Sequence, residues 1–345
     1  MVPMTERIED VDQLEDLLSE PSAEVVSSLG RLSGDIMVLG AGGKMGPTLA
    51  RMASRALEAG SSRGRVIAVS RFSNRRERER LESQGVETIG CDLLDPRALE
   101  ELPEVPTVIY MVGMKFGSTG NEARTWAVNA YLPAMVCRRF SRSRIVAFST
   151  GNVYPMTPVS GGGSSEEDPP APEGEYAMSC LGRERMFEYF SRTRGTRVAL
   201  LRLNYACELR YGVLVDLARK VWERRPIDLT MGHVNVIWQG DANAMALRAV
   251  QHCAAPPFLV NIAGPERLSV RRICRELGRL MNRPLNLVGE EAADALLSDG
   301  RRGHERLGRP RVAIEWLLGW IADWVMRGGP SLGKPTHFQV RDGRF

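Results

Sequence analysis

Lysine is the residue that this sequence lacks most clearly. Only four of its 46 basic residues are lysines, Lys44, Lys115, Lys220 and Lys334, and all the others are arginines. A preference of this kind reflects genomic base composition before it reflects chemistry. It nevertheless makes each of the four positions that keep a lysine worth examining as a candidate functional residue.

Cysteine and histidine are also few, and their spacing carries no motif. The six cysteines form no CxxC pair, and the four scattered histidines provide no metal-ligand spacing. We therefore expect no metal site and predict free thiols in a reducing cytoplasm. The cysteines are Cys91, Cys137, Cys180, Cys207, Cys253 and Cys274.

Long apolar runs and a strong charge of one sign are missing as well. No segment approaches the roughly 20 apolar residues of a membrane span, and the acidic N-terminus lacks the regions of a signal peptide. The net charge is only +4, which is not typical of a nucleic-acid binder. The alternating Arg and Glu residues of segment 74–82 indicate a solvated helix face. These features favour a cytoplasmic protein with a small-molecule partner, without nucleic acid or membrane.

What the sequence does contain, from Gly34 onwards, is an alternation of short apolar runs with helical segments. This order indicates βαβ units with right-handed crossovers and hence a parallel sheet. We predict an α/β fold, a Rossmann-type doubly wound parallel sheet with a smaller C-terminal α/β substrate lobe and an N-terminal helical extension. The expected strands are residues 35–39, 66–69, 86–89, 107–112, 144–148 and 198–203, and the helices between them are 45–59, 74–84, 122–140 and 176–193.

The later part of the chain mixes both kinds of element. We expect helices at 212–224, 269–281 and 311–326, strands near 234–238 and at 258–262, and one further helix capped by Asp241. Residues 158–175, rich in Pro, Gly, Ser and Glu, are expected to form a surface loop. The predicted domains are therefore an acidic helical extension (1–33), a dinucleotide-binding domain (34–205), a substrate lobe partly interleaved with the core (206–330) and a C-terminal tail (331–345).

The two ends of the chain each leave alternatives open. Residues 5–19 have the apolar stripe of an amphipathic helix, and a second short helix ends at Gly30. Such a stripe must be buried, either by docking on the body of the protein, which we favour, or in a dimer contact. The tail around Lys334 and His337 either folds over a pocket or, as the default for a terminus, stays mobile.

A glycine loop follows the first predicted strand. Gly40, Gly43 and Gly46 allow a tight turn, close approach of the backbone to a pyrophosphate, and close packing of the next helix. The exposed N–H groups and the positive end of that helix then hold phosphate groups, and Lys44 within the loop is expected to contact one of them. Because a second strand follows about 20 residues later, the context predicts dinucleotide binding.

The end of the second strand bears on which dinucleotide is bound. An acidic residue there accepts hydrogen bonds from a ribose 2′-hydroxyl, but this strand ends in Ser70 and Arg71. A neutral side chain beside a guanidinium suits a 2′-phosphate. We therefore expect NADP(H) in preference to NAD(H). The alternative is that Arg71 is one more surface arginine.

Several motifs occur in an order that resembles the extended short-chain dehydrogenase/reductases, the NAD-dependent epimerase/dehydratase group. The resemblance covers residues 34–330 and includes the glycine loop, the Asp-Leu pair after the third strand, the loop after the fourth strand, a helical Asn, the Ser-Thr-Gly-Asn-Val-Tyr segment and a Tyr-led helix. It implies a homodimer formed through helices 122–140 and 176–193. Together with the loop and strand-end residues discussed above, it gives the expected cofactor contacts: Gly40, Gly43, Lys44, Met45, Gly46, Ser70, Arg71, Asp92, Leu93, Met111, Gly113 and Asn129.

The resemblance also implies the catalytic groups. Thr150 stands at the place of the family's catalytic hydroxyl, and Tyr176 at that of its proton-transferring tyrosine, with Asn152 and Asn204 as substrate contacts. The tyrosine of the family is followed four residues later by a lysine, but Cys180 occupies that position. A neutral thiol supplies neither the positive charge that favours tyrosinate nor a lysine's hydrogen bonds.

Three outcomes follow from the missing lysine. Another cation can replace it: Lys115 after the fourth strand is our candidate, since Arg183 and Arg185 lie two turns or more along the helix from Tyr176. Tyr176 can instead act as an acid in carbonyl reduction, or in a redox-neutral elimination, cyclisation or aldol cleavage. The site can also be inactive, leaving a non-catalytic dinucleotide-binding regulatory protein. We expect an oxidoreductase or epimerase-like enzyme that acts on a small polar carbonyl or hydroxy compound or a sugar derivative.

Overall fold

A seven-stranded parallel sheet forms the centre of the fold. The computed structural model describes residues 7–115 and 117–343. The strands follow the order β12-β7-β5-β4-β1-β2-β3, and every neighbouring pair is parallel. The doubly wound parallel sheet predicted from the sequence is confirmed. The strands are β1 (Ile36–Leu39), β2 (Val66–Ser70), β3 (Glu87–Gly90), β4 (Thr107–Tyr110), β5 (Arg144–Thr150), β7 (Arg197–Leu203) and β12 (Phe258–Ile262).

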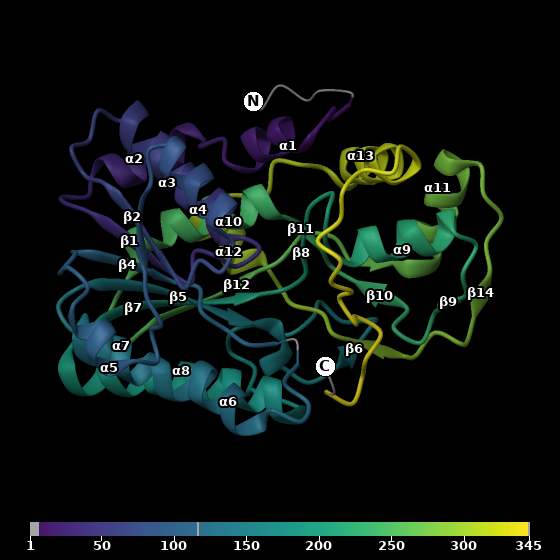
Figure 1. The fold of residues 1–345 in the computed structure, drawn as a ribbon. Coiled ribbons are helices and arrows are strands. Elements are labelled where there is room, and N and C mark those ends of the chain that lie inside the picture. Colours follow the sequence, from purple (N-terminus) through teal and green to yellow (C-terminus); the bar gives the residue numbers. More distant parts are fainter. Residues whose placement is uncertain (1–6, 116, 344–345) are drawn as a thin grey trace.

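Helices cover both faces of this sheet (Figure 1). One face carries α2 (Ala23–Gly30), α3 (Gly46–Ala59), α4 (Arg75–Ser83), α10 (Gln239–Ala249) and α12 (Arg301–Leu307). The other carries α5 (Pro96–Glu100), α6 (Glu122–Trp126), η1 (Ala127–Tyr131), α7 (Leu132–Arg139) and α8 (Gly174–Arg194). Strand β1, at the centre of the sheet, is apolar throughout because both faces are covered, and all four of its residues are buried.

A smaller lobe lies beyond the carboxyl ends of the strands (Figure 1). Its core is formed by α9 (Val213–Trp222), α11 (Val270–Met281) and α13 (Ile314–Met326), which contact one another. Four short strand pairs among the described residues lie within the lobe or at its junction with the sheet half (Figure 1). They are β8 (Ala206–Cys207) with β11 (Ile237–Trp238), β9 (Ile227–Asp228) with β14 (Leu287–Val288), β10 (His233–Val234) with β13 (Leu268–Ser269), and β6 (Thr157–Pro158) with β15 (Asp294–Ala295).

The N-terminal stripe docks on the body of the protein. Helix α1 (Val11–Leu18) is capped by Asp10 and buries Leu14 and Leu18 completely in the core of the lobe. Its acidic side is paired as well, since Glu15 contacts Arg210 at 2.8 Å and Arg80 at 2.8 Å. The docking that we favoured is confirmed for residues 7–19, whereas residues 5 and 6 of the predicted helix lie outside the described residues.

One local prediction is wrong, and a second holds only in part. Asp241 does not cap a helix but lies in the first turn of α10, where its carboxylate accepts hydrogen bonds from the backbone of Arg311 and Val312. Segment 158–175 is a surface loop over most of its length, as predicted, but it is anchored to the body of the protein. Ser164 is buried, and Glu166 accepts a 2.7 Å hydrogen bond from the backbone N–H of Asn261. In both cases a partner distant in sequence determines the structure.

The C-terminal tail is the third departure. Residues 331–343 are irregular, as expected, but they are packed against the molecule instead of being mobile. Thr336 donates hydrogen bonds to Asp216 from its backbone N–H (2.7 Å) and its hydroxyl (2.6 Å), and Phe338 is buried in the lobe core. The tail leaves α13 and runs along the junction between the sheet half and the lobe (Figure 1).

Within residues 7–115 and 117–343, no helix is both long and apolar enough to cross a bilayer.

Candidate functional site

The glycine loop connects β1 to α3 at the carboxyl edge of the sheet. Gly40 has a φ of +85°, and a Cβ there would lie 2.9 Å from the backbone nitrogen of Val112. A Cβ on Gly46 would collide with the backbone of Ala41, and one on Gly42 would lie 2.5 Å from Oγ of Ser70. The loop therefore has the close packing that allows backbone N–H groups and the helix N-terminus to face a phosphate.

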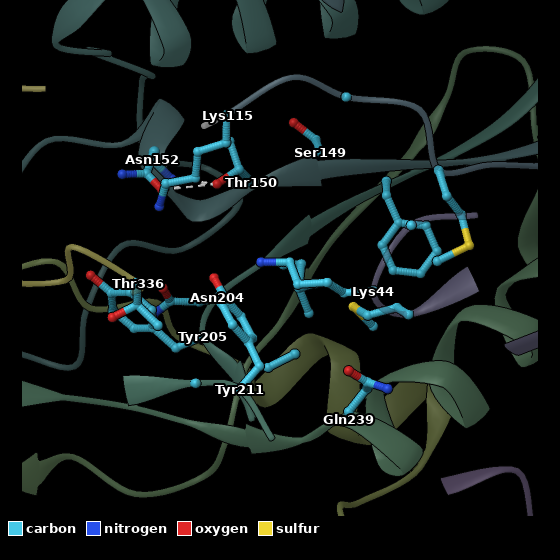
Figure 2. A pocket seen from close by; sticks show the side chains of 18 of the residues that line it. Lys44, Lys115, Ser149, Thr150, Asn152, Asn204, Tyr205, Tyr211, Gln239 and Thr336 are labelled. Atoms are coloured by element: carbon cyan, nitrogen blue, oxygen red, sulfur yellow. Dashed lines mark hydrogen bonds between the residues drawn. The ribbon is translucent and has the colours of Figure 1, made fainter. Parts of the chain in front are cut away.

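A cavity of about 370 Å³ opens beside this loop, at the carboxyl ends of β1, β4, β5 and β7. In doubly wound sheets ligands bind at this edge. Figure 2 shows Lys44 projecting from the glycine loop into the cavity, with Thr150 and Tyr211 among the side chains around it. The predicted site residues in its lining are Gly40, Gly43, Lys44, Met45, Gly46, Met111, Gly113, Lys115, Thr150, Asn152, Tyr176 and Asn204.

Thr150 and Tyr176 line the same cavity from two different elements. Thr150 ends β5, and its hydroxyl donates a 3.0 Å hydrogen bond to Oδ1 of Asn152. Tyr176 lies in the first turn of α8. Burial raises the pKa of Tyr176 well above its ordinary value and Cys180 adds to the increase, while Arg183 and a hydrogen bond with Thr150 oppose it. Tyr176 is therefore a protonated phenol that is able to donate a proton.

Cys180 is completely buried behind Tyr176, in a small apolar cluster with Val153 and Tyr154. Burial raises the pKa of its thiol, so the thiol is neutral at physiological pH. The position that carries a lysine in the related family provides no charge here.

Arg183 brings a positive charge to the place where that lysine is missing. Its guanidinium is buried and lines the cavity, and it donates hydrogen bonds to the carbonyl of Phe148 (2.8 Å) and to Oδ1 of Asn129 (2.8 Å). A Cβ on Gly113 would lie 2.9 Å from its Nη2 atom, so the glycine leaves room for it. We ranked Arg183 below Lys115 because it lies two turns along the helix from Tyr176, but its side chain reaches the cavity because helical side chains point back toward the N-terminus.

Two lysines approach the cavity from its loops. Nζ of Lys115 lies 5.6 Å from the centroid of the Tyr176 ring, and burial lowers the pKa of Lys115 to about 8. Nζ of Lys44 lies 3.2 Å from the centroid of the Tyr211 ring. The pKa of Lys44 is lowered to about 7, chiefly by burial and then by the charges of Lys115 and Lys334. The cavity thus gathers several basic side chains, of which Lys44 is only partly protonated at neutral pH.

The model of the NAD dependent epimerase/dehydratase family matches residues 36–208. The chain belongs to this family. The resemblance recognised from the sequence is thereby confirmed, and the family places the chain among NAD-dependent epimerase/dehydratase enzymes. No curated protein sequence gives a significant match.

Solved structures of the same fold cover most of the chain. MoeE5 in complex with UDP-glucose and NAD is 20% identical, with a TM-score of 0.67 over 86% of this chain and 99% of that one. UDP-glucuronic acid 4-epimerase from Bacillus cereus, in complex with NAD, is 18% identical, with a TM-score of 0.70 over 85% and 96%. A short-chain dehydrogenase/reductase from Agrobacterium tumefaciens with bound NAD is 17% identical, with a TM-score of 0.69 over 85% and 98%. At these identities the likeness shows the fold.

Asn129 lies outside the cavity of this family member. Its side chain is buried in η1 and holds the loop after β4 through both the N–H and the carbonyl of Met114, each at 2.9 Å. It also donates to Oγ of Ser179 and accepts from Arg183. In the structure Asn129 therefore positions Arg183 and the loop that contains Lys115.

The other predicted cofactor contacts lie farther along the carboxyl edge. Ser70 ends β2 next to the glycine loop, and Arg71 is exposed. Asp92 and Leu93 follow β3, where Asp92 accepts a 3.1 Å hydrogen bond from the backbone of Leu94. None of the four is among the described residues that line the cavity. The sheet places them beside the glycine loop, on the side away from Thr150 and Tyr176.

Three polar residues after β5 lie at or behind the wall of the cavity. Tyr154 is buried and donates a 3.0 Å hydrogen bond to Asn261. Arg202 pairs with Glu184 at 2.7 Å, and both are buried. Asn204 reaches the cavity lining and donates a 2.7 Å hydrogen bond to Asn235. Tyr154 and Arg202 thus support the wall of the cavity without lining it, whereas Asn204 lines it.

Proposed function

We propose that this protein is an NAD(P)-dependent oxidoreductase or epimerase that acts on a sugar nucleotide or another small polar carbonyl or hydroxy compound. The observation that carries the proposal is the cavity at the carboxyl edge of the sheet. Its lining combines a glycine loop suited to a dinucleotide with the Thr150 hydroxyl, the Tyr176 phenol and a set of cations. The related structures contain NAD together with UDP-glucose in one case, which supports this class of ligand.

The loop fits a dinucleotide. The glycines at 40, 43 and 46 leave space where side chains would meet the backbone, and α3 begins directly after them with Pro47 in its first turn. We propose that the backbone around Gly43 and Met45 holds the pyrophosphate, and that Ser70, Arg71, Asp92 and Leu93 contact the adenosine half. A bound dinucleotide would supply or accept a hydride at its nicotinamide ring.

The side chains of the site then transfer a proton to the substrate. We propose that Thr150 and Asn152 orient the substrate oxygen, and that Tyr176 donates its proton to that oxygen. The raised pKa of Tyr176 keeps the phenol protonated at neutral pH but also weakens it as an acid, so proton donation needs positive charge near the phenol oxygen. The tyrosinate left behind would be stabilised by the positive charges of Arg183 and Lys115. The missing lysine therefore favours the reducing direction, in which Tyr176 begins as the acid.

The cofactor preference is a separate part of the proposal. Because β2 ends in Ser70 instead of an acidic residue, and because Arg71 follows it, we propose NADP(H) as the preferred dinucleotide. Titration of the protein with NADPH and NADH, followed by the fluorescence of the reduced nicotinamide, tests this preference. An equal or tighter affinity for NADH would contradict it.

Turnover tests the proposed function itself. UDP-glucose and UDP-glucuronic acid would be incubated with the protein and either NAD⁺ or NADP⁺, with products followed by NMR and reduced cofactor by absorbance. Reduction of small carbonyl compounds by NADPH would be measured in parallel. We expect Tyr176→Phe to lose at least about a hundredfold of any activity found, because general acid catalysis contributes roughly that much.

Two outcomes would change the proposal. Intact turnover in Tyr176→Phe would contradict the role of this residue. Tight dinucleotide binding without turnover of any compound would instead support the alternative of a non-catalytic regulatory protein.

A further inference from the structure

The C-terminal tail supplies part of the wall of the candidate site. Lys334 and Thr336 line the cavity together with Thr150 and Tyr176, and Figure 2 shows Thr336 among the side chains that surround it. The tail follows α13 and lies well beyond residues 36–208, which the family model matches. Its effect on the site therefore follows from the contacts of this chain and not from family membership.

The tail is anchored to the lobe at several points along its length. The backbone N–H of Leu332 donates a 3.1 Å hydrogen bond to the carbonyl of Arg210. Thr336 donates to Asp216 from its backbone N–H and its hydroxyl, at 2.7 and 2.6 Å, and the Phe338 side chain is buried in the lobe core. Because a swing of the tail would break these contacts together, the tail is a fixed wall and not a loose flap.

The far end of the tail reaches the helix that carries Tyr176. Nη1 of Arg341 donates a 3.1 Å hydrogen bond to the carbonyl of Asp294. Beyond it, Gly343 packs on the start of α8, where a Cβ on Gly174 would lie 2.8 Å from the carbonyl carbon of Gly343. The tail thus runs along the junction between the sheet half and the lobe, from the end of α13 to the start of α8 (Figure 1).

The cavity beside this wall is small. Its volume is about 370 Å³, near the lower end of the roughly 300–1,000 Å³ that pockets for one drug-sized ligand have. The glycine loop lies at one side of the cavity, so the nicotinamide end of a dinucleotide would fill part of this volume. A substrate that carries a nucleotide of its own would have to extend toward the lobe, through the space that the tail occupies.

The rest of the lining indicates which kind of small molecule fits. Beside Thr150 and Tyr176 it presents the side chains of Asn152, Asn204 and Thr336. Hydroxyl, phenol and amide groups both donate and accept hydrogen bonds, so they suit the carbonyl and hydroxyl oxygens of a polar compound.

We infer that the tail restricts the site to a small polar carbonyl or hydroxy compound and excludes nucleoside-diphosphate sugars. Thr336 is the specificity-determining residue that faces the substrate, and Asp216 and Phe338 hold it in place. The inference rests on the proposed function for treating the cavity as the substrate site, and it chooses between the two substrate classes of that function. Exclusion by a clash with the protein is an ordinary route to specificity.

Calorimetric titration with UDP-glucose, on protein saturated with NADPH, tests the exclusion. The two tail variants are a truncation that removes residues 336–345 and the full-length Phe338→Ala, which removes the buried anchor. Leu14→Ala is the matched control, because it removes a side chain of the same core from α1 instead of the tail. We expect wild type and Leu14→Ala to bind UDP-glucose with a Kd above about 1 mM, and both tail variants to bind it at least about tenfold more tightly.

A gain in affinity in the truncated protein cannot be an effect of charge. The deleted segment contains Arg341 and Arg344 but only one acidic residue, Asp342. Its removal makes the region less positive, which weakens the attraction for a diphosphate. Hydrogen exchange gives a second readout: the backbone N–H groups of Leu332 and Thr336 should be protected in the wild type and should exchange faster in Phe338→Ala.

The outcomes decide between the wall and its absence. Submillimolar binding of UDP-glucose by the wild type, no gain in either tail variant, or an equal gain in Leu14→Ala would overturn the inference. Rapid exchange of the tail amides in the wild type would overturn it as well. A failure of NADPH to bind contradicts the proposed function instead, and it shows in the fluorescence titration before UDP-glucose is added. The same comparison of variants is then made without a dinucleotide.

Discussion

At the scale of single residues, Cys180 and Arg183 form the most unusual feature of the site. The chain has a buried neutral thiol where its family has a lysine, and a buried guanidinium from one turn further along the helix. The three hydrogen bonds of Arg183 go to uncharged oxygen atoms, on Phe148 and Asn129. Arg183 therefore leaves a positive charge at the base of the cavity, beside Tyr176.

This arrangement predicts that a lysine cannot simply be restored. Cys180→Lys would place a second buried cation beside Arg183, and we expect it to lower the free energy of unfolding by about 3 kcal/mol or more. Adding Arg183→Met should recover part of that loss, because one cation then replaces the other. Urea unfolding of the two single variants and the double variant measures the coupling.

A second buried cysteine provides the control for this double-mutant cycle. Cys274 is equally buried but lies in α11 of the lobe. Cys274→Lys should destabilise the protein to a similar extent, but Arg183→Met should not relieve it. Equal coupling energies for positions 180 and 274 would mean that Arg183 does not occupy the place of the missing lysine.

Lys44 leads to a prediction about pH. Its pKa is lowered to about 7, chiefly by burial and then by Lys115 and Lys334, against the opposing charges of Asp216 and Glu208. A bound diphosphate favours the protonated amine and raises this pKa. Binding should therefore take up a proton above pH 7, and affinity should fall as the pH rises from 7, by up to about tenfold per unit. Below pH 7, where Lys44 is already protonated, affinity should change little.

Calorimetry of ADP-ribose binding at pH 6, 7 and 8, in two buffers of different ionisation enthalpy, measures that proton uptake. Lys44→Arg keeps the charge at all three values, so its binding should depend less on pH. A residual dependence is expected from Lys115, whose pKa is lowered to about 8. Affinity that rises between pH 7 and pH 8 would contradict the assignment.

At the scale of elements, the sequence was informative wherever a segment determines its own structure. Apolar runs between helical segments predicted the strands of the sheet, and the glycine loop predicted the turn before α3, whose Gly40 requires a positive φ. Elements held by distant partners were missed. The tail is held by the hydrogen bond from Thr336 to Asp216, and Asp241 accepts a hydrogen bond from the backbone of Arg311 instead of capping its own helix.

The residues of the site also fall into those that the sequence predicts and those that distant contacts place. Thr150 and Tyr176 could be recognised because they belong to short motifs. Arg183 could not be ranked correctly, since its role depends on the direction of its side chain and on the space above Gly113. The only feature of the sequence that marked Lys334 as a candidate functional residue is that lysine is rare in this chain. Its place at the cavity follows from contacts made some 120 residues apart, between Thr336 and Asp216.

The docking of α1 gives a prediction about stability. Leu14 is fully buried in the lobe core, so Leu14→Ala should lower the free energy of unfolding by about 2–5 kcal/mol. Leu17→Ala on the same helix, where the side chain is only partly buried, is the control and should cost less. Urea unfolding measures both. If the stripe instead served a dimer contact, Leu14→Ala would change the oligomeric state and leave the stability of the protomer nearly unaltered.

At the scale of the whole molecule, one face remains apolar and exposed. It lies on α6, η1 and α8, which pack against one another on the side of the sheet away from α3. Trp126 is 39% exposed, Tyr131 60%, Met178 38% and Tyr189 57%. Met178 and Tyr189 are about three turns apart on α8, so they share one side of this helix. Large aromatic side chains and methionine are enriched in protein interfaces.

We therefore propose that two copies associate through this face to form a homodimer. A stable dimer buries roughly 1,200–2,000 Å² in total, which two long helices per protomer can provide. We expect sedimentation equilibrium to give twice the chain mass of 38.2 kDa at micromolar concentration. Tyr131→Glu combined with Tyr189→Glu should shift the protein to monomers, because a dimer would bury the new charges without partners.

A charge at another exposed aromatic controls for the substitution itself. Trp316 is 38% exposed but lies on α13 in the lobe, so Trp316→Glu should leave the dimer intact. The monomeric variant should still bind NADH, because the residues that line the cavity come from one chain. A wild-type protein that is monomeric at tens of micromolar would exclude this dimer. A double variant that keeps the wild-type mass would show that a different surface carries the association.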